Sequence, residues 1–255
     1  MKVFIIPCHF DNYSYILADE TTGDNVIIDP CEGWPILSIL LENKLKPGAM
    51  LCTHHHHDHI DGLDDIRAEY PGIAVYGHQS DTHRIPGITH PVADGDLVQA
   101  GSLSGQVLHT PGHTTGSVVY RFADLLFTGD TLFGAGCGRL FEGSPRQMME
   151  SLEKITAGDP AGKLYFGHEY TVTNLRFSMQ LEPENKMVLQ RYTALVEAGR
   201  PSTPSTIGEE LMTNPFLRCR EPGIITWLKK HDPCRDFPDQ ESVFTRIREI
   251  RNDFS

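Results

Sequence analysis

The chain has 255 residues, of which 39% are hydrophobic and 22% are charged, as expected for a globular protein that buries a large core. No stretch approaches the ~20 apolar residues that span a bilayer, and a formal net charge of −12 disfavours general binding to nucleic acid. We therefore expect neither a membrane nor a nucleic-acid partner. Residues 1–200 carry 14 Lys/Arg against 25 Asp/Glu, whereas residues 201–255 carry eight against nine, so an anionic small molecule would prefer the C-terminal part.

The N-terminal apolar run ends at Pro7 and is shorter than the ~7–15 residues of a signal-peptide core, so residues 1–7 are predicted to form a first strand. The six cysteines are scattered without a C-x-x-C pair. This pattern predicts neither a disulfide framework nor a cysteine zinc site, and it favours a cytoplasmic location.

Short apolar runs rich in Val, Ile and Tyr continue to about residue 170, between segments rich in Gly, Pro and Asp. Such runs predict strands, here at residues 15–17, 26–28, 50–52, 74–76, 118–120 and 125–127. Apolar residues at helical spacing predict helices at residues 34–43 and 63–69. The pattern predicts a mixed α/β domain over residues 1–170.

After Glu169 the pattern changes to helices alone, separated by Gly or Pro. We predict them at residues 174–180, 185–198, 206–212 and 242–251, with residues 200–205 as a connecting loop. A second, all-α domain is therefore expected over residues 171–255.

A histidine-rich run, residues 53–59, directly follows the apolar run 49–52, and five of the chain's 13 histidines lie within it. A purification tag would lie at a terminus, and a solvated loop would rarely concentrate so uncommon a residue. Histidine and aspartate clustered at a strand end indicate metal ligands. Alternate side chains of an extended segment point the same way, so His54 and His56 could share one ion while Asp58 and His59 turn towards a second. His55 and His57 are not expected to be ligands.

Three further candidate ligands each come just after an apolar run, where α/β folds place their sites. They are His113 in Thr-Pro-Gly-His-Thr, Asp130 in Thr-Gly-Asp-Thr, and His168 in Phe-Gly-His-Glu. Each signal is weak alone, and the conjunction is strong. Imidazole and carboxylate donors suit zinc, iron or manganese alike.

These four segments together resemble the metallo-β-lactamase superfamily. The resemblance implies a four-layer α/β/β/α sandwich with two divalent ions per chain, zinc being favoured over iron or manganese. It also implies a set of seven metal ligands: His54, His56 and His113 on one ion, Asp58, His59 and His168 on the other, and Asp130 between them.

Segments 137–143, 167–171 and 214–218, with the C-terminal Arg248-x-x-Arg251-x-x-Phe254, are similar to the hydroxyacylglutathione hydrolases, the glyoxalase II family, nearly end to end. The resemblance implies that the helical domain binds glutathione, with substrate contacts at Arg139, Tyr170, Arg248 and Arg251. Arg139 and Arg251 stand where lysine is common in eukaryotic members. Phe141 stands where a tyrosine hydroxyl helps to bind substrate, so we expect no hydrogen bond from it.

The resemblance further implies hydrolysis of S-(2-hydroxyacyl)glutathione, chiefly S-D-lactoylglutathione, to glutathione and D-lactate, the second step of methylglyoxal detoxification. Metal coordination lowers the pKa of water to roughly 7, and Asp58 and Asp130 are the carboxylates expected to orient the hydroxide. The expected partner is the small-molecule thioester alone, and the protein is expected to be a monomer.

Two alternatives stay open. A mononuclear iron persulfide dioxygenase shares the first motif and also acts on a glutathione derivative, but it would bind one iron per chain and consume oxygen. A metal-binding protein without activity is the other alternative, although seven protein ligands on two ions leave the open position of a catalytic site.

Overall fold

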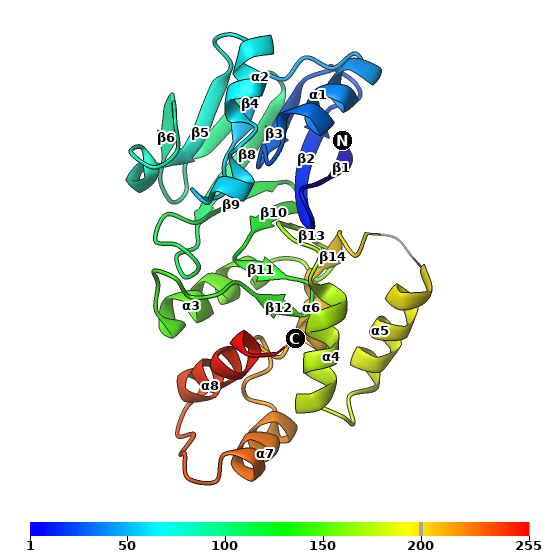
Figure 1. Ribbon diagram of the computed structural model, residues 1–255, viewed down its shortest axis with the longest axis vertical. Coiled ribbons are helices and arrows are strands. Elements are labelled where there is room, and N and C mark those ends of the chain that lie inside the picture. Colours follow the sequence, from blue (N-terminus) through cyan, green and yellow to red (C-terminus); the bar gives the residue numbers. More distant parts are fainter. Residues whose placement is uncertain (199–200, 255) are drawn as a thin grey trace.

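The computed structural model describes residues 1–198 and 201–254. Its first sheet has six strands in the order β1 to β6, coloured blue to cyan in Figure 1. β1 to β3 run antiparallel, and β3 to β6 run parallel. The strands are β1 (Lys2–Cys8), β2 (Asn12–Ala18), β3 (Asn25–Ile28), β4 (Ala49–Leu51), β5 (Ala74–His78) and β6 (His90–Val92).

The second sheet also has six strands, in the order β14-β13-β10-β9-β8-β7. β10 and β13 pair in parallel, whereas the other neighbours are antiparallel. The strands are β7 (Leu97–Ala100), β8 (Leu103–His109), β9 (Val118–Phe122), β10 (Leu125–Gly129), β13 (Lys163–Phe166) and β14 (Ser205–Thr206). A small hairpin, β11 (Leu132–Phe133) and β12 (Gly136–Cys137), follows β10.

Alternation along the strands builds the layers, because successive side chains of a strand point to opposite faces. Tyr15 and Leu17 of β2 join the core between the two sheets, whereas Ile16 packs on the outer face. That outer face is covered by α1 (Gly33–Glu42) and α2 (Leu63–Glu69). On the second sheet, Leu126 faces away from the first sheet and towards α3 (Pro145–Thr156). The expected α/β/β/α sandwich is confirmed.

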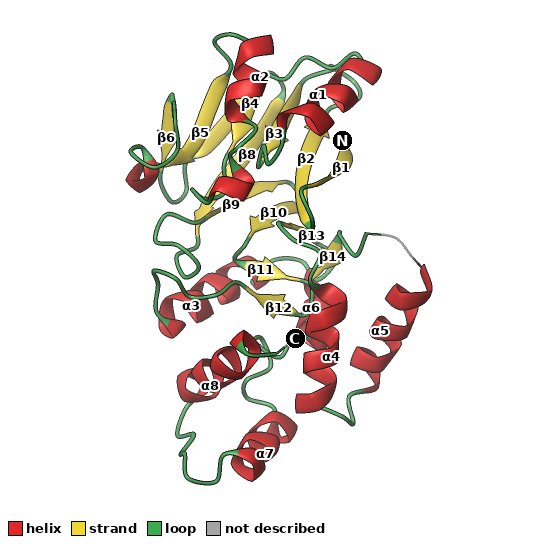
Figure 2. Cartoon of the chain, viewed as in Figure 1, coloured by secondary structure: helices red, strands yellow, loops and turns green. Residues whose placement is uncertain are grey.

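The C-terminal part is helical and extends the layer of α3 (Figures 1 and 2). Phe177, Phe216 and Phe244 are fully buried and share one apolar cluster with the outer face of the second sheet. The helices are α4 (Thr171–Leu181), α5 (Lys186–Ala198), α6 (Ile207–Thr213), α7 (Pro222–His231) and α8 (Gln240–Asn252). Two short 3₁₀ helices, η1 (His57–His59) and η2 (Gln79–Asp81), lie in the α/β part.

The predicted strands and helices are present, with small shifts of their ends. The short strands β6, β7, β11, β12 and β14 and the helices α3 and α7 were not predicted. α3 begins with Ser144 as its N-cap in a capping box with Gln147, a sequence signal that could have been recognised. α7 begins at Pro222, a proline in the first turn, which also marks helix starts. The prediction of a loop over residues 200–205 is wrong at Ser205, which pairs with β13, and Arg200 lies outside the described residues.

Within residues 1–198 and 201–254, no helix is long and apolar enough to cross a membrane.

Candidate metal centre and adjoining pocket

The histidine and aspartate candidates lie on four loops, each after the end of a strand. Residues 53–59 follow β4, His113 follows β8, Asp130 follows β10, and His168 follows β13. Backbone hydrogen bonds tie these loops across the two sheets, such as Val118 N to Thr53 O at 2.9 Å. A Cβ at Gly167 would overlap Asp130 Oδ1 and His59 Cε1, so any side chain there would displace two of the candidate donors.

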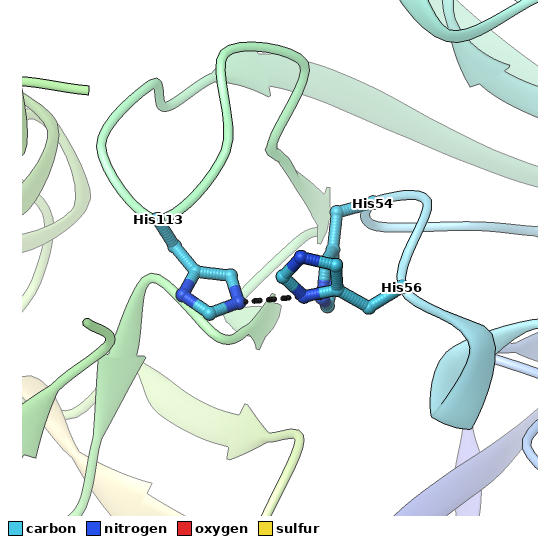
Figure 3. A group of neighbouring side chains, drawn as sticks. All are labelled: His54, His56 and His113. Atoms are coloured by element: carbon cyan, nitrogen blue, oxygen red, sulfur yellow. Dashed lines mark hydrogen bonds between the residues drawn. The ribbon is translucent and has the colours of Figure 1, made fainter. Parts of the chain in front are cut away.

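The donor atoms gather into three groups, each with its members' donor atoms within 4.8 Å of one another. In the first group, which Figure 3 shows, the rings come from two separate loops, and both His54 Nε2 and His113 Nε2 lie 3.0 Å from His56 Nδ1. The groups are His54, His56 and His113; Asp58, His59 and His168; and His54, His59 and Asp130. All seven predicted ligands are therefore brought together, and His55 and His57 belong to none of these groups.

Asp130 lies between the first two groups. Its Oδ2 is 3.4 Å from both His113 Nε2 and His168 Nε2, and its Oδ1 is 3.3 Å from His59 Nε2. The Oδ1 atom is buried and has no hydrogen-bond partner among the described residues. Since a buried carboxylate oxygen is costly to leave unpaired, this atom fits a position facing a cation.

Two buried or partly buried carboxylates hold histidines of the second group by their outer nitrogens. Asp29 Oδ2 lies 3.1 Å from His59 Nδ1, and Asp11 Oδ1 lies 2.8 Å from His168 Nδ1. Each contact leaves the Nε2 atom facing the centre, which is how second-layer carboxylates orient metal-binding histidines. Neither residue was predicted from the sequence. Asp29 comes directly after the apolar run 26–28 and could have been found, whereas Asp11 gave no signal.

The histidines of the first group are held by neutral partners. His54 Nδ1 lies 3.1 Å from Thr53 Oγ1, and His113 Nδ1 lies 2.8 Å from the backbone oxygen of Arg139. Burial lowers the pKa of His54 and His113, and burial with the neighbouring His113 lowers the pKa of His56 to about 4. These imidazoles are therefore neutral at pH 7 and offer lone pairs, as metal binding requires.

In the second group, by contrast, the neighbouring carboxylates favour a positive charge on the histidine. Burial opposes protonation of His168, but the carboxylates of Asp130 and Asp58 outweigh it and raise the pKa of His168 to about 12. Burial likewise opposes ionisation of Asp58, but His168, His59 and Asn12 together bring the pKa of Asp58 below its usual range. Carboxylates that attract a proton this strongly also favour a cation. Neutral imidazoles, converging carboxylates and the unpaired Asp130 oxygen together fit two divalent ions.

A cavity of about 460 Å³ opens beside these donors. Its lining includes five donor residues, here called the metal-donor end, and three arginines, here called the arginine end, together with Tyr170. The donors are His56, Asp58, His113, Asp130 and His168, and the arginines are Arg139, Arg248 and Arg251. The structure thus brings all the predicted substrate-binding residues to the same cavity as the predicted ligands. Tyr170 stacks flat on His168, with ring centroids 4.9 Å apart and planes 1° apart.

The three arginines come from the loop after β12 and from α8. Arg248 is only 6% exposed and donates from Nη1 to the backbone oxygen of Cys137 at 2.6 Å, so it also supports that loop. Arg251 is half-buried and donates from Nε to Asn174 Oδ1 at 3.0 Å. Burial lowers the pKa of Arg251, and the charges of Arg248 and Arg139 lower it further. The three positive charges lie close together, so an anionic ligand bound beside them would reduce their mutual repulsion.

Phe141 lies at the mouth of the cavity, with 63% of its surface exposed. Its ring stands edge-on to His56 and His113, at centroid distances of 5.6 Å and 5.3 Å. It supplies an apolar wall next to the donor groups and has no hydrogen-bonding atom on its side chain.

Family models match nearly the whole chain. One described as the metallo-beta-lactamase superfamily matches residues 10–168, and one described as the hydroxyacylglutathione hydrolase C-terminus matches residues 169–254. Among solved structures, ETHE1 from Myxococcus xanthus is 26% identical with a TM-score of 0.67 over 100% of both chains. The BLEG-1 B3 metallo-beta-lactamase is 25% identical with the same TM-score, over 85% of this chain and 99% of its own. The fold is that of the metallo-β-lactamase superfamily, and the donor groups lie within the matched residues.

Curated relatives identify the family within this superfamily to which the chain belongs. The hydroxyacylglutathione hydrolase of Synechococcus sp. (strain JA-3-3Ab) is 41% identical over 100% of both chains. That of Jannaschia sp. (strain CCS1) is 42% identical over 99% of this chain and 98% of its own. The chain belongs to the hydroxyacylglutathione hydrolase family.

Proposed function

We propose that the protein hydrolyses the thioester bond of S-(2-hydroxyacyl)glutathione, chiefly S-D-lactoylglutathione, to glutathione and D-lactate, the second step of methylglyoxal detoxification. The observation that carries this proposal is the shared cavity, which is lined both by metal-donor residues and by a cluster of arginines. Full-length relatives named hydroxyacylglutathione hydrolase support the same reaction.

The ligand assignment follows the three donor groups. His54, His56 and His113 would hold one divalent ion, Asp58, His59 and His168 would hold the other, and Asp130 would contact both. When bound, such ions lower the pKa of water to roughly 7 and polarise a carbonyl oxygen. Zinc is the favoured metal, with iron or manganese compatible with the same donors.

The catalytic carboxylates are Asp58 and Asp130, which would orient the water that attacks the thioester carbonyl. Asp58 is held in place by Asn12, whose Nδ2 donates to Asp58 Oδ2 at 2.9 Å. Because the pKa of Asp58 is below its usual range, its carboxylate is ionised at neutral pH and acts as a hydrogen-bond acceptor. The leaving group is a thiolate, so a strong general acid is not needed.

The glutathione part of the substrate carries carboxylates, and the arginine end of the cavity offers their counter-charges. Arg139, Arg248 and Arg251 would bind these carboxylates, with Arg–carboxylate pairing favoured by the planar guanidinium. Tyr170 would contact the substrate beside His168. Binding so far from the reacting carbonyl holds the thioester in position for attack.

Residues 1–170 would form the catalytic domain, and residues 171–255 the glutathione-binding domain. We further propose that the protein works in the cytoplasm as a monomer. All six cysteines are free thiols, which agrees with a reducing compartment.

The test is a thioester assay on metal-loaded protein together with elemental analysis. We expect release of free thiol from S-D-lactoylglutathione, two metal ions per chain, and loss of activity in Asp58→Ala. A metal-loaded preparation that releases no thiol would refute the proposal. One iron per chain with oxygen consumption would instead support the dioxygenase, and bound metal without either activity would support a non-enzyme.

A further inference from the structure

An ionic cluster centred on Arg84 lies outside the cavity, behind the loops of the site. Arg84 donates from Nε and Nη2 to Asp81 Oδ1 at 3.1 Å and 2.5 Å, and from Nη1 to Glu142 Oε1 at 2.5 Å. Asp81 is fully buried, and the side chains of Arg84 and Glu142 are 24% and 27% exposed. None of these three residues lines the cavity. A partly desolvated network of this kind is stronger than an isolated surface ion pair.

The cluster reaches the histidine run through His55, which is not a metal-ligand candidate. His55 Nε2 lies 3.4 Å from Arg84 Nη1, and His55 Nδ1 lies 3.6 Å from Asp81 Oδ2. Because His55 stands between His54 and His56, these contacts place the outer side of that loop against the cluster. Nothing in the metal-ligand assignment uses this histidine.

Glu142 joins two more loops of the site. Its Oε2 accepts hydrogen bonds from Thr115 N at 2.7 Å and from Thr115 Oγ1 at 2.8 Å. Thr115 follows His113 by two residues, and Glu142 follows Arg139 by three. The ion pair of Arg84 and Glu142 therefore stands where the loops of residues 53–59, 110–117 and 138–143 meet.

The loop 138–143 affects both ends of the cavity. The backbone oxygen of Arg139 holds His113 Nδ1 at 2.8 Å, and Phe141 N donates to the backbone oxygen of His113 at 3.2 Å. The side chain of Arg139 lines the arginine end of the same cavity. A shift of this loop would move a metal-donor imidazole and a substrate-binding guanidinium together.

We propose that Arg84 and Glu142 are positioning residues, whose ion pair sets the loop 138–143 and so couples the binding of the glutathione end to the orientation of His113. The effect on substrate binding rests on the proposed function. The effect on metal retention does not, because the orientation of His113 affects metal binding whatever reaction the protein catalyses.

The test compares this ion pair with a matched one. Arg218 and Glu182 form a partly buried pair, with Nε and Nη2 of Arg218 at 2.8 Å and 2.9 Å from Glu182, in the helical part and away from the cavity lining. The variants are Glu142→Gln, Arg84→Met and Arg84→Lys, with Glu182→Gln and Arg218→Met as controls. On metal-loaded protein, the readouts are KM and kcat for S-D-lactoylglutathione, the rate of metal loss to a chelator, and the melting temperature.

We expect Glu142→Gln and Arg84→Met to raise KM and to speed metal loss by about tenfold each, the size found when partners of metal-binding residues are removed. Arg84→Lys should recover part of both effects, and the control variants should stay within about twofold of the parent protein. Glu142→Gln keeps the shape of the side chain, so it tests the inference even if Arg84→Met fails to fold.

The inference is overturned if either the rate of metal loss or KM in Glu142→Gln matches that in Glu182→Gln. It is also overturned if the two ion pairs change only the melting temperature. A parent protein that loses metal slowly but releases no thiol would refute the proposed function alone, and the metal-loss comparison would still decide on the coupling to His113.

Discussion

The two ends of the cavity are built in different ways. At the metal-donor end, His54, His59, His113 and His168 are almost wholly buried, and the second nitrogen of each ring contacts a named oxygen. At the arginine end, Arg139 and Arg251 are held partly by backbone oxygens and repel one another through like charge. The side chains of the metal-donor end are thus pre-oriented, whereas the arginine end is characterised by closely spaced positive charges.

This difference predicts that the two ends of the cavity affect different kinetic constants. Groups that are already oriented before the reaction can stabilise the transition state, because they need not reorganise at the moment of reaction. Charges near solvent mainly supply affinity that is shared by the ground state and the transition state. Substitutions at the donor end should therefore lower kcat, and those at the arginine end should raise KM.

The largest effect is expected from Asp130→Ala. The change removes the carboxylate between the two donor groups, so we expect kcat/KM to fall by more than ~10³-fold, with fewer than two ions retained per chain. Steady-state kinetics and elemental analysis of the same preparation measure both. Full metal content with more than about a tenth of the activity would contradict the assigned role.

Asp29→Asn should have the next largest effect. Asp29 accepts hydrogen bonds from Thr53 N and Oγ1 and orients His59. Losing its charge should reduce metal affinity or activity by about 10–100-fold, measured by competition with a chelator. Asp24→Asn is the control, because partly exposed Asp24 accepts a hydrogen bond from Ser102 N and belongs to none of the donor groups. Equal metal affinity in both variants would argue against an orienting role.

Arg251→Met tests the other end of the comparison. We expect KM to rise about tenfold while kcat stays within about twofold, as for a group that binds ground and transition states alike. Added salt should raise KM in the parent protein, because the charges of exposed Arg139 and half-buried Arg251 are partly screened, and should raise it less in the variant. Arg235→Met is a control, since Arg235 pairs with Glu249 outside the cavity. A fall in kcat without a change in KM would contradict the expectation that the arginine end affects KM alone.

The smallest effect is expected from Phe141→Tyr. The added hydroxyl stands at the cavity mouth, and one new hydrogen bond to substrate is worth about 1 kcal/mol, so KM should fall about fivefold. Phe141→Leu keeps an apolar side chain without a hydroxyl and should not lower KM. If Phe141→Tyr has a KM no lower than that of Phe141→Leu, the family tyrosine has no counterpart site in this chain.

Much of the candidate site could be predicted because its proposed ligands lie in short segments next to strands. Residues 53–59 carry four of the seven proposed ligands, and the regular position of His113, Asp130 and His168 after apolar runs supplied the other three. Seven strands, β1 to β5, β9 and β10, and six of the eight α-helices in the described residues were predicted for a similar reason, since apolar runs and helical spacing are local properties. The capped start of α3 was an overlooked local signal rather than a missing one.

The sequence by itself determined the kinds of donor atom, the class of fold and the presence of a helical C-terminal part, because these depend on neighbours along the chain. Only the tertiary structure decided what orients the donors. Asp11 reaches His168 across 157 positions, and Arg84 reaches Glu142 across 58. Such pairs leave no spacing in the sequence, because the folding of the two sheets against each other, and not local geometry, brings their atoms together.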